Sequence, residues 1–236
     1  MHKPESRTIV YALWAAFPAL LLGAAWAAAE EPAKKAKADP YQWRDLFDGK
    51  TLDGWKTPKF GGEGKVKVQE GAIVLGMGDP MTGIAWSGDF PKVDYEVTLD
   101  AKKTEGDDFF ATATFPVGDS FCSFVTGGWA GTVTGLSSID YIDASENSTT
   151  GFKNFEKGRW YHFRIRVTKA KIECWIDDQK TVDFVTTGHK ISLRFEVDPC
   201  RPFGFSSYMT EGRLRKIRLR QLTSAESAAE TPSEKE

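Results

Sequence analysis

Apolar and polar side chains alternate with a period of two in several segments of the chain. At 93–101 every odd position is apolar and every even position is polar, and related alternation occurs at 161–167 and 172–177. A segment of this kind packs one face on a core and exposes the other, which is the pattern of a half-buried β-strand. Further strands are predicted at eight segments: 65–69, 72–77, 109–116, 120–126, 182–185, 191–197, 203–208 and 214–222.

Turn-forming residues separate these segments at short intervals. They are Asp48-Gly49, Glu70-Gly71, Gly78-Asp79-Pro80, Gly118-Asp119, Gly127-Gly128, Lys157-Gly158 and Asp177-Asp178. No stretch of a dozen residues after the N-terminal segment has a convincing helical period, and a parallel sheet would need crossover helices. The pattern therefore predicts an all-β fold in which two antiparallel sheets pack face to face.

One region, 129–151, departs from the alternation. It is dense in Ser, Thr, Asn, Asp and Glu, which indicates a long loop between strands. Functional residues concentrate in such loops because the scaffold positions them without burying them. We therefore look for a site in this region first.

The first 29 residues have the features of a secretory signal peptide. Lys3 and Arg7 precede an apolar run at 9–22, and small residues follow it. The run contains Pro18 and is shorter than the roughly 20 residues that span a bilayer. We expect export to the periplasm or the extracellular space, with no stable membrane span after cleavage. An uncleaved membrane anchor is the alternative.

Composition divides the rest of the chain. Residues 30–40 mix Ala, Lys, Pro and acidic residues and indicate a linker, and residues 224–236 indicate a disordered tail. Between them, 41–223 has the length of one domain.

The net charge of −2 gives no sign of a nucleic-acid partner, and the basic stretch at 213–220 alternates with apolar residues like a solvated strand face. The cysteines, Cys122, Cys174 and Cys200, are expected to be small buried hydrophobes with at most one bridge.

The segment Leu46-Phe47-Asp48-Gly49-Lys50-Thr51-Leu52-Asp53-Gly54-Trp55 resembles the opening of the 3-keto-disaccharide hydrolase domain family. Physically, the motif predicts a short strand, an Asp-Gly turn, Leu52 returning to the core and Trp55 anchored against a sheet. Later segments resemble the family in the same order: 70–74, 158–161, 172–177 and 214–222. The resemblance covers 45–222 and implies a concanavalin A-like jelly roll from a bacterial source.

The resemblance also implies a reaction on sugars. A ketone at C3 of a glycoside acidifies the hydrogen at C2, so that a base can remove the proton and the glycosidic oxygen at C1 can leave with help from an acid. Conventional hydrolysis would instead use two carboxylates at a controlled separation. A different class of function stays open: a non-catalytic carbohydrate-binding module on the same sandwich.

Both readings direct attention to carboxylates and aromatic rings. Asp140, Asp143 and Glu146 lie in the polar region 129–151 and are catalytic candidates, with Asn147 beside them as a binding residue. Glu196 lies on the polar face of the predicted strand 191–197 and shares its parity with Arg194. This arrangement predicts either a carboxylate–guanidinium pair in a cleft or a surface ion pair.

Two tryptophans are candidates for stacking on a sugar. Trp129 follows Gly127-Gly128, which would let the indole stand clear of the backbone, although a core position is the alternative. Trp175 faces away from the apolar side of its strand, toward either an open sugar platform or a covering loop. No His/Cys spacing indicates a metal site, so we expect no cofactor, with acidic clusters such as Asp107-Asp108 as weak candidates for Ca²⁺.

Overall fold

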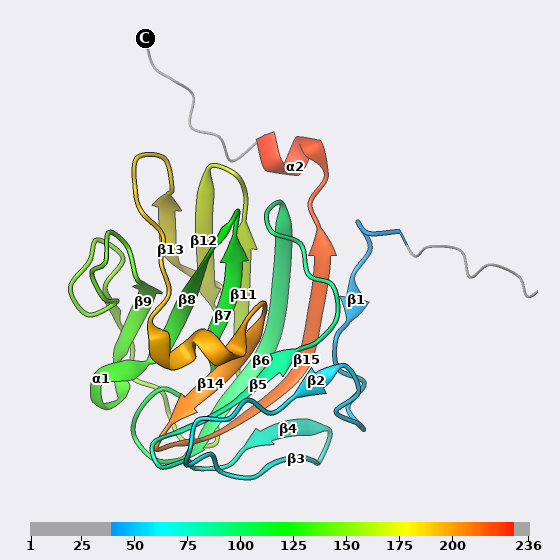
Figure 1. Ribbon diagram of the computed structural model, residues 1–236, viewed down its shortest axis with the longest axis vertical. Coiled ribbons are helices and arrows are strands. Elements are labelled where there is room, and N and C mark those ends of the chain that lie inside the picture. Colours follow the sequence, from blue (N-terminus) through cyan, green and yellow to red (C-terminus); the bar gives the residue numbers. More distant parts are fainter. Residues whose placement is uncertain (1–38, 229–236) are drawn as a thin grey trace, which may run out of the picture. The chain divides into compact units, whose positions relative to one another are not determined.

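The computed structural model describes residues 39–228; the predicted signal peptide and nearly all of the predicted linker lie outside the described residues. Two antiparallel sheets form a sandwich in the part that is described (Figure 1). The first has eight strands. In spatial order they are β13 (Gln179–Val185), β12 (Lys171–Ile176), β11 (Tyr161–Val167), β6 (Tyr95–Glu105), β15 (Glu211–Gln221), β4 (Ala72–Leu75) and β3 (Val66–Gln69), with β1 (Arg44–Asp45) paired to β15.

The second sheet has seven strands and forms the other layer of the sandwich. In spatial order they are β10 (Gly151–Phe152), β9 (Val133–Ser137), β8 (Ser120–Gly127), β7 (Thr112–Val117), β14 (Gly204–Tyr208), β5 (Met81–Trp86) and β2 (Trp55–Lys56). Every pairing in both sheets is antiparallel, and neighbours in space are often distant in sequence, as where β6 lies between β11 and β15. The sandwich of two antiparallel sheets predicted from the alternation is confirmed.

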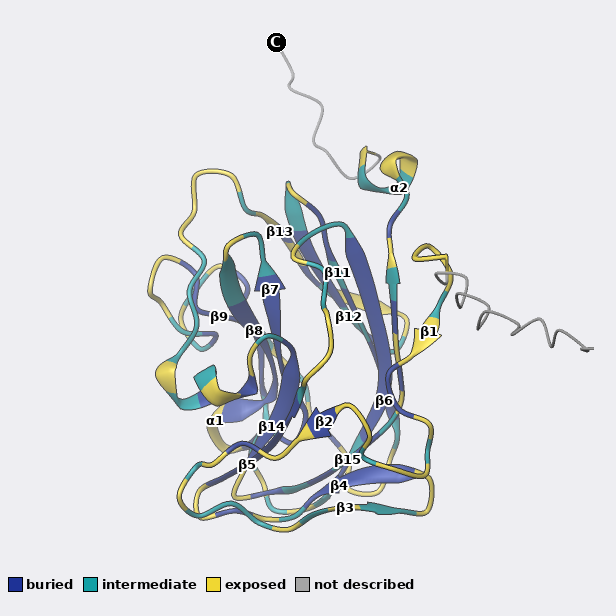
Figure 2. Ribbon diagram, turned by 45° about the vertical axis from the view of Figure 1, so that its right-hand side comes forward, coloured by how far each residue is buried: buried dark blue, intermediate teal, exposed yellow. Residues whose placement is uncertain are grey.

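Alternating side chains fill the space between the sheets. Where β6 pairs with β11, the odd-numbered residues of both strands face inward and lie opposite one another, as Leu99 does with Phe163 and Val97 with Ile165. The inner strands are largely buried (Figure 2), and the interior is aromatic as well as aliphatic. Its largest fully buried side chains are Tyr95, Tyr161, Phe110, Phe115, Phe124, Phe163, Phe203 and Phe205.

The opening motif anchors the N-terminal part of the domain. Leu46 is buried, and the Asp48 carboxylate accepts hydrogen bonds from the backbone N–H groups of Lys50 and Thr51 and fixes the turn. Leu52 packs against the core, and the buried Trp55 donates its indole N–H to the carbonyl of Leu46 at 2.7 Å. The turn, the return of Leu52 to the core and the anchoring of Trp55 are therefore as predicted, whereas the short strand β1 (Arg44–Asp45) lies just before the motif.

Helical structure is short. It comprises α1 (Gly128–Gly131), the 3₁₀ helix η1 (Phe195–Cys200) and α2 (Ser224–Ala228). The last of these occupies the start of the predicted disordered tail, so the tail is helical where it is described; 229–236 lie outside the described residues. No helix in 39–228 combines the length and apolarity needed to cross a membrane. The three cysteines are free and buried, as expected of small core residues.

Within the domain predicted at 41–223, two segments differ from the sequence predictions. The region 129–151 is only partly a loop, because β9 occupies its first half and pairs with β8 through residues such as Leu136 and Phe124. The segment 191–197 is not a strand: Ile191 makes a single bridge to Ile139, and the chain then turns into η1. The alternation predicted that Phe195 and Val197 face the same side of a strand, but Phe195 is 82% exposed while Val197 is buried. The segment containing η1 contacts β5, β7 and β14 (Figure 1).

Candidate functional site

A pocket of about 380 Å³ opens on the outer face of the seven-stranded sheet, between η1 and α1. This volume lies in the range of sites for small ligands, which is about 300–1,000 Å³. Strands β5, β7, β8, β9 and β14 supply its walls together with the two helical turns. The lining residues are Met81, Asp108, Phe109, Thr112, Ser123, Val125, Trp129, Ser137, Arg194, Glu196, Val197 and Tyr208.

Small hydroxyl side chains on adjacent strands form one wall of the pocket. Thr112 on β7, Ser123 on β8 and Ser137 on β9 are all buried. The Ser123 hydroxyl donates to the backbone carbonyl of Ser137 at 2.9 Å. The Thr112 hydroxyl has no hydrogen-bond partner among residues 39–228. An unpaired buried hydroxyl is costly, so this group is available to a polar ligand.

Arg194 is the cationic centre of the site. Its guanidinium makes two hydrogen bonds to the Glu196 carboxylate, Nη2 to Oε1 at 2.6 Å and Nε to Oε2 at 3.2 Å. Its remaining terminal nitrogen, Nη1, contacts Asp143, whose Oδ1 lies 3.3 Å from the Ser137 hydroxyl and 3.4 Å from that of Ser138. Two carboxylates thus fix the plane of one guanidinium, which is the geometry that arginine suits best.

The charges of this cluster support one another. Burial by itself would raise the pKa of Glu196, but the hydrogen bonds from Arg194 outweigh burial and lower the pKa below its ordinary value. The same contacts raise the pKa of Arg194. Glu196 is therefore an anion at neutral pH and Arg194 a cation. The predicted Arg194–Glu196 pair exists, and it lies in a pocket.

The turn that carries Trp129 has a left-handed backbone. The φ angles are 49° at Trp129 and 65° at Ala130, so α1 is a turn and not a regular helix. Left-handed conformations cost a non-glycine residue roughly 1–2 kcal/mol, and such strain tends to occur at functional sites. The Asp108 carboxylate stabilises the turn by accepting the Ala130 N–H at 3.0 Å. As a result the Trp129 indole stands 44% exposed beside the pocket.

Asp108 and two further aromatic rings complete the pocket. The second Asp108 oxygen accepts the N–H of Phe109 at 2.8 Å. The rings of Phe109 and Tyr208 lie 5.8 Å apart, and both line the pocket. Three aromatic side chains with a few directed polar groups are typical of a binding site for a small amphipathic molecule.

Three of the eight residues predicted from the sequence line this pocket: Trp129, Arg194 and Glu196. A fourth, Asp143, contacts Arg194 from behind. Asn147 lies in the same segment as Asp143 but does not line the pocket. It has a structural role, since its side-chain amide donates to the carbonyls of Leu136 and Ile142.

The other three predicted residues lie elsewhere. Asp140 sits in a turn, where it accepts the Lys190 N–H and pairs with His189; the hydrogen bonds from Lys190 and then His189 lower its pKa. Glu146 is exposed and does not line the pocket. Trp175 belongs to β12 of the opposite sheet, where the Arg164 guanidinium covers its ring at 3.6 Å, in place of either a sugar platform or a covering loop.

Several pocket residues were not found from the sequence. The sequence predicts Asp108 only as a weak calcium ligand, and Phe109, Thr112 and Tyr208 only as strand residues, whereas all four line the pocket. Asp108 is held at the pocket by its hydrogen bond to the Ala130 N–H in the strained turn, and no local sequence pattern indicates that hydrogen bond. In 39–228 no group of three or more His, Cys, Asp or Glu residues is arranged to hold a metal ion.

Comparisons with known proteins agree with this architecture. A family model described as a 3-keto-α-glucoside-1,2-lyase-like domain matches residues 42–220. No curated protein matches the chain.

Among solved structures, the fold is similar to a predicted glycosyl hydrolase from Parabacteroides distasonis (13% identity, TM-score 0.51, 77% of this chain and 94% of that chain). It is also similar to the transglycosylase Crh5 in complex with NAG (14% identity, TM-score 0.53, 79% of this chain and 86% of that chain). A third similar structure is a GH16 endo-β-1,3(4)-glucanase (10% identity, TM-score 0.52, 77% of this chain and 96% of that chain). At these identities the similarity establishes the fold alone.

Proposed function

Because the chain belongs to the family of 3-keto-α-glucoside-1,2-lyase-like domains, we propose that it cleaves the glycosidic bond of a 3-keto glycoside in the pocket beside η1. The observation that carries this proposal is the convergence of Asp108, Glu196 and Arg194 on one pocket with three aromatic rings. A binding module needs the rings, and removal of a proton needs in addition a carboxylate base and a cation, which Asp108 and Arg194 supply.

The contacts of each carboxylate suggest its role. Glu196 uses both oxygens on Arg194, and Asp143 is shared between Arg194 and two serine hydroxyls. Asp108 accepts one backbone N–H at each oxygen, which leaves further lone pairs on both. We therefore assign Asp108 as the base that takes the C2 proton, and Glu196 and Asp143 as the residues that orient Arg194.

In this assignment the Arg194 guanidinium faces the ketone oxygen at C3, on which negative charge develops. When the C2–H bond breaks, its electron pair delocalises onto the ketone oxygen at C3, and a fixed cation stabilises the resulting enolate. The pair subsequently forms a C1–C2 double bond as the C1–O bond breaks, and the departing sugar oxygen takes up a proton. The hydroxyl of Tyr208 is our candidate donor, since Tyr208 lines the pocket and no hydrogen bond engages its hydroxyl in the described part of the chain.

The test of this chemistry uses the substrate's oxidation state. The full chain is incubated with a 3-keto disaccharide and with the same disaccharide before oxidation, and products are separated chromatographically. Cleavage of the keto form alone is the expected result, with a primary isotope effect when C2 carries deuterium. Equal cleavage of both forms would show that the ketone has no part in the reaction and would reject the mechanism.

A second function has one observation in its favour. Trp129 is 44% exposed, and an exposed indole suits a module that binds sugar without cleaving it. If the protein binds the disaccharide and leaves it intact at every pH tested, while Trp129→Ala abolishes binding, the binding-module proposal replaces the enzyme.

Export is the remaining part of the proposal, and it rests on the basic and apolar residues at 1–29. The expected product is a mature chain that begins near residue 30 and is recovered outside the cytoplasm. N-terminal sequencing of the protein from cell fractions tests this. A full-length chain found only in the cytoplasm would contradict it.

A further inference from the structure

A second pocket, which we call the end pocket, lies at one end of the eight-stranded sheet. Tyr95 at the start of β6 pairs with Val167 at the end of β11 and with Gln221 at the end of β15, so these three strand ends lie side by side. Helix α2 follows β15 at this end (Figure 1). The end pocket has a volume of about 540 Å³ and shares no residue with the pocket beside η1. Its walls include Tyr41, Asp94, Lys169, Gln221 and Ser227.

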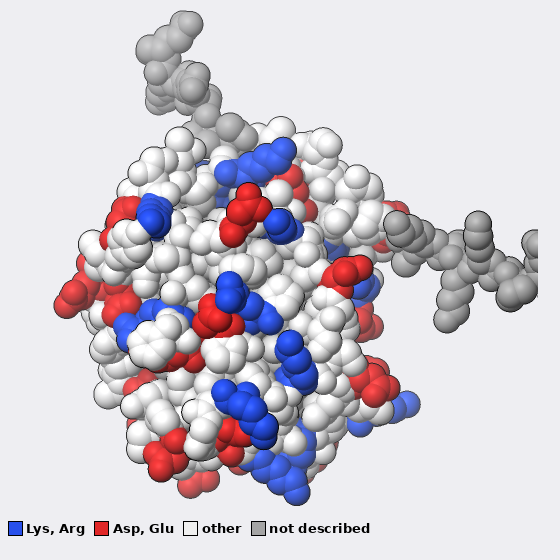
Figure 3. All heavy atoms as spheres, in the orientation of Figure 1, with Lys and Arg blue, Asp and Glu red and all other residues white. Residues whose placement is uncertain are grey.

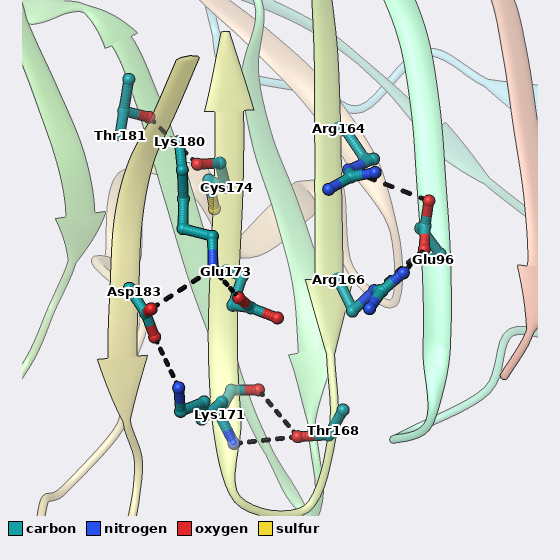
Figure 4. Close-up of polar contacts among 10 residues, drawn as sticks. All are labelled: Glu96, Arg164, Arg166, Thr168, Lys171, Glu173, Cys174, Lys180, Thr181 and Asp183. Carbon is teal, nitrogen blue, oxygen red and sulfur yellow. Dashed lines mark hydrogen bonds and ion pairs between the residues drawn. The ribbon is translucent and has the colours of Figure 1, made fainter. Parts of the chain in front are cut away.

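Side-chain hydrogen bonds fix two of the segments that form the end pocket. At α2 the Glu226 carboxylate accepts the N–H and the hydroxyl of Thr223, both at 2.9 Å. In the turn between β11 and β12 the Thr168 hydroxyl accepts the N–H of Lys171 at 3.0 Å, and the Lys171 ammonium donates to Asp183 at 2.9 Å (Figure 4). The two middle residues of this turn line the end pocket, which is therefore built into the fold.

Two polar atoms in the end pocket are buried and have no hydrogen-bond partner among residues 39–228. They are Oδ1 of Asp94 and the hydroxyl oxygen of Ser227. A buried polar atom without a partner costs free energy, and the cost is larger for a charged group. An ionised carboxylate only accepts hydrogen bonds, so the group that Asp94 lacks is a donor. The end pocket is therefore suited to a ligand that brings a donor to Asp94.

The other walls narrow the class of ligand. A cation with N–H groups makes the strongest hydrogen bonds to a carboxylate. Lys169 lines the same pocket, and its ammonium would repel a ligand that carries several positive charges. The Tyr41 ring, 47% exposed, offers an apolar face for a sugar ring, while Gln221 and Ser227 can exchange hydrogen bonds with hydroxyl groups. One positive charge on a polyhydroxyl ring satisfies all of these groups.

The surface as a whole gives a cation little general attraction. The net charge of the chain is −2. On the side viewed in Figure 3, acidic and basic side chains are interspersed. Recognition of one ammonium group therefore falls to the end pocket itself.

We propose that the end pocket binds an amino sugar. The ammonium group of the sugar donates to Oδ1 of Asp94, its hydroxyls pair with Ser227 and Gln221, and its ring packs against Tyr41. The volume of the end pocket lies in the range of about 300–1,000 Å³ that is typical of sites for small ligands. This site does not depend on the reaction proposed beside η1.

The test compares three sugars that differ at one position. Glucosamine carries an ammonium group at C2 below neutral pH, N-acetylglucosamine carries an uncharged amide there, and glucose carries a hydroxyl. Calorimetric titration of the full chain should show binding of glucosamine and at least tenfold weaker binding of the other two. Glucosamine alone should raise the Tm, because a ligand that binds only the folded state stabilises it.

Variants assign the binding to the end pocket. Asp94→Asn removes the charge at a left-handed position, φ 57°, which asparagine also adopts, so the variant should fold. It should bind glucosamine about tenfold more weakly than the parent, and Ser227→Ala about fivefold more weakly. The matched control Asp178→Asn removes an exposed carboxylate from the turn between β12 and β13 and should bind like the parent. Trp129→Ala, in the pocket beside η1, should also leave glucosamine binding unchanged.

Four results would overturn the proposal. The first is equal affinity of the parent for all three sugars, and the second is absence of glucosamine binding by the folded parent. The third is parental affinity in both Asp94→Asn and Ser227→Ala, or a loss in Trp129→Ala alone. The fourth is tighter binding of putrescine or glycine than of glucosamine, which would assign the end pocket to another class of amine. Cleavage of a 3-keto disaccharide should be unchanged in Asp94→Asn, so the two proposals succeed or fail separately.

Discussion

Replacing Thr112 by Val should stabilise the domain and lower its affinity for the substrate. The side chain is 2% exposed, lines the pocket, and has a hydroxyl without a partner among the described residues. Leaving a buried hydroxyl unpaired costs about 1–3 kcal/mol, and valine has nearly the same shape. We therefore expect Thr112→Val to raise the free energy of unfolding by about 1 kcal/mol, which corresponds to roughly 2–4 °C in Tm for a domain of this size.

Ser123→Ala is the matched comparison. Ser123 is equally buried and lines the same pocket, but its hydroxyl donates to the Ser137 carbonyl at 2.9 Å. Its removal should lower the free energy of unfolding by about 1 kcal/mol. Urea denaturation and calorimetry measure both variants, and titration with a 3-keto disaccharide measures affinity, which should fall in Thr112→Val. A lower Tm for Thr112→Val would refute the reasoning, because it would mean that the hydroxyl already has a partner.

Three further predictions concern separate parts of the molecule. Trp129→Ala should weaken disaccharide binding by roughly tenfold or more, measured by calorimetric titration, with little change in Tm because the ring is 44% exposed; unchanged affinity would exclude the ring from the site. Burial alone would raise the pKa of Asp100, but hydrogen bonds from His162 and Lys216 lower it. Its stabilising effect is thus complete above the unfolded pKa of about 3.9 and is lost as pH falls through the lower folded value. Asp100→Asn should therefore unfold more easily than the parent at pH 7, and the difference should shrink in denaturation curves as the pH falls below the unfolded pKa of about 3.9; a constant difference would contradict this. Burial raises the pKa of Cys122 and of Cys200 to about 12, so neither should react with a thiol reagent at pH 8 until the protein unfolds, and rapid labelling of the folded chain would disagree.

The sheets were predictable because their information is local. Alternation at 93–101 and 161–167 determines which side of each strand faces the core, and the structure pairs Leu99 with Phe163 accordingly. The segment 191–197 has the same alternation and forms a bridge and a 3₁₀ helix, with Phe195 outside. Alternation indicates which faces are apolar. It does not show whether a free sheet edge exists for the segment to join.

The site was harder to predict because it is assembled from distant parts of the chain. Arg194 and Glu196 were found since they are neighbours in sequence, and Trp129 since two glycines precede it. The position of Asp108 depends on the hydrogen bond that its carboxylate accepts from the backbone N–H of Ala130. The two residues are 22 positions apart in sequence, and Ala130 lies in a strained turn. Asp140 and Asp143 looked equivalent in sequence, yet the fold directs one to His189 and the other to Arg194.

The central claim is that a glycoside is cleaved in the pocket that Arg194 and Glu196 share. The most direct measurement is the rate of sugar release from a 3-keto disaccharide by the parent, by Glu196→Gln and by Glu146→Gln. Both variants exchange a glutamate for its amide, but only Glu196 holds Arg194 with two hydrogen bonds. The account predicts a loss of about a hundredfold or more in kcat/KM for Glu196→Gln and parental activity for Glu146→Gln. Equal activity in all three proteins, or a loss confined to Glu146→Gln, would contradict it.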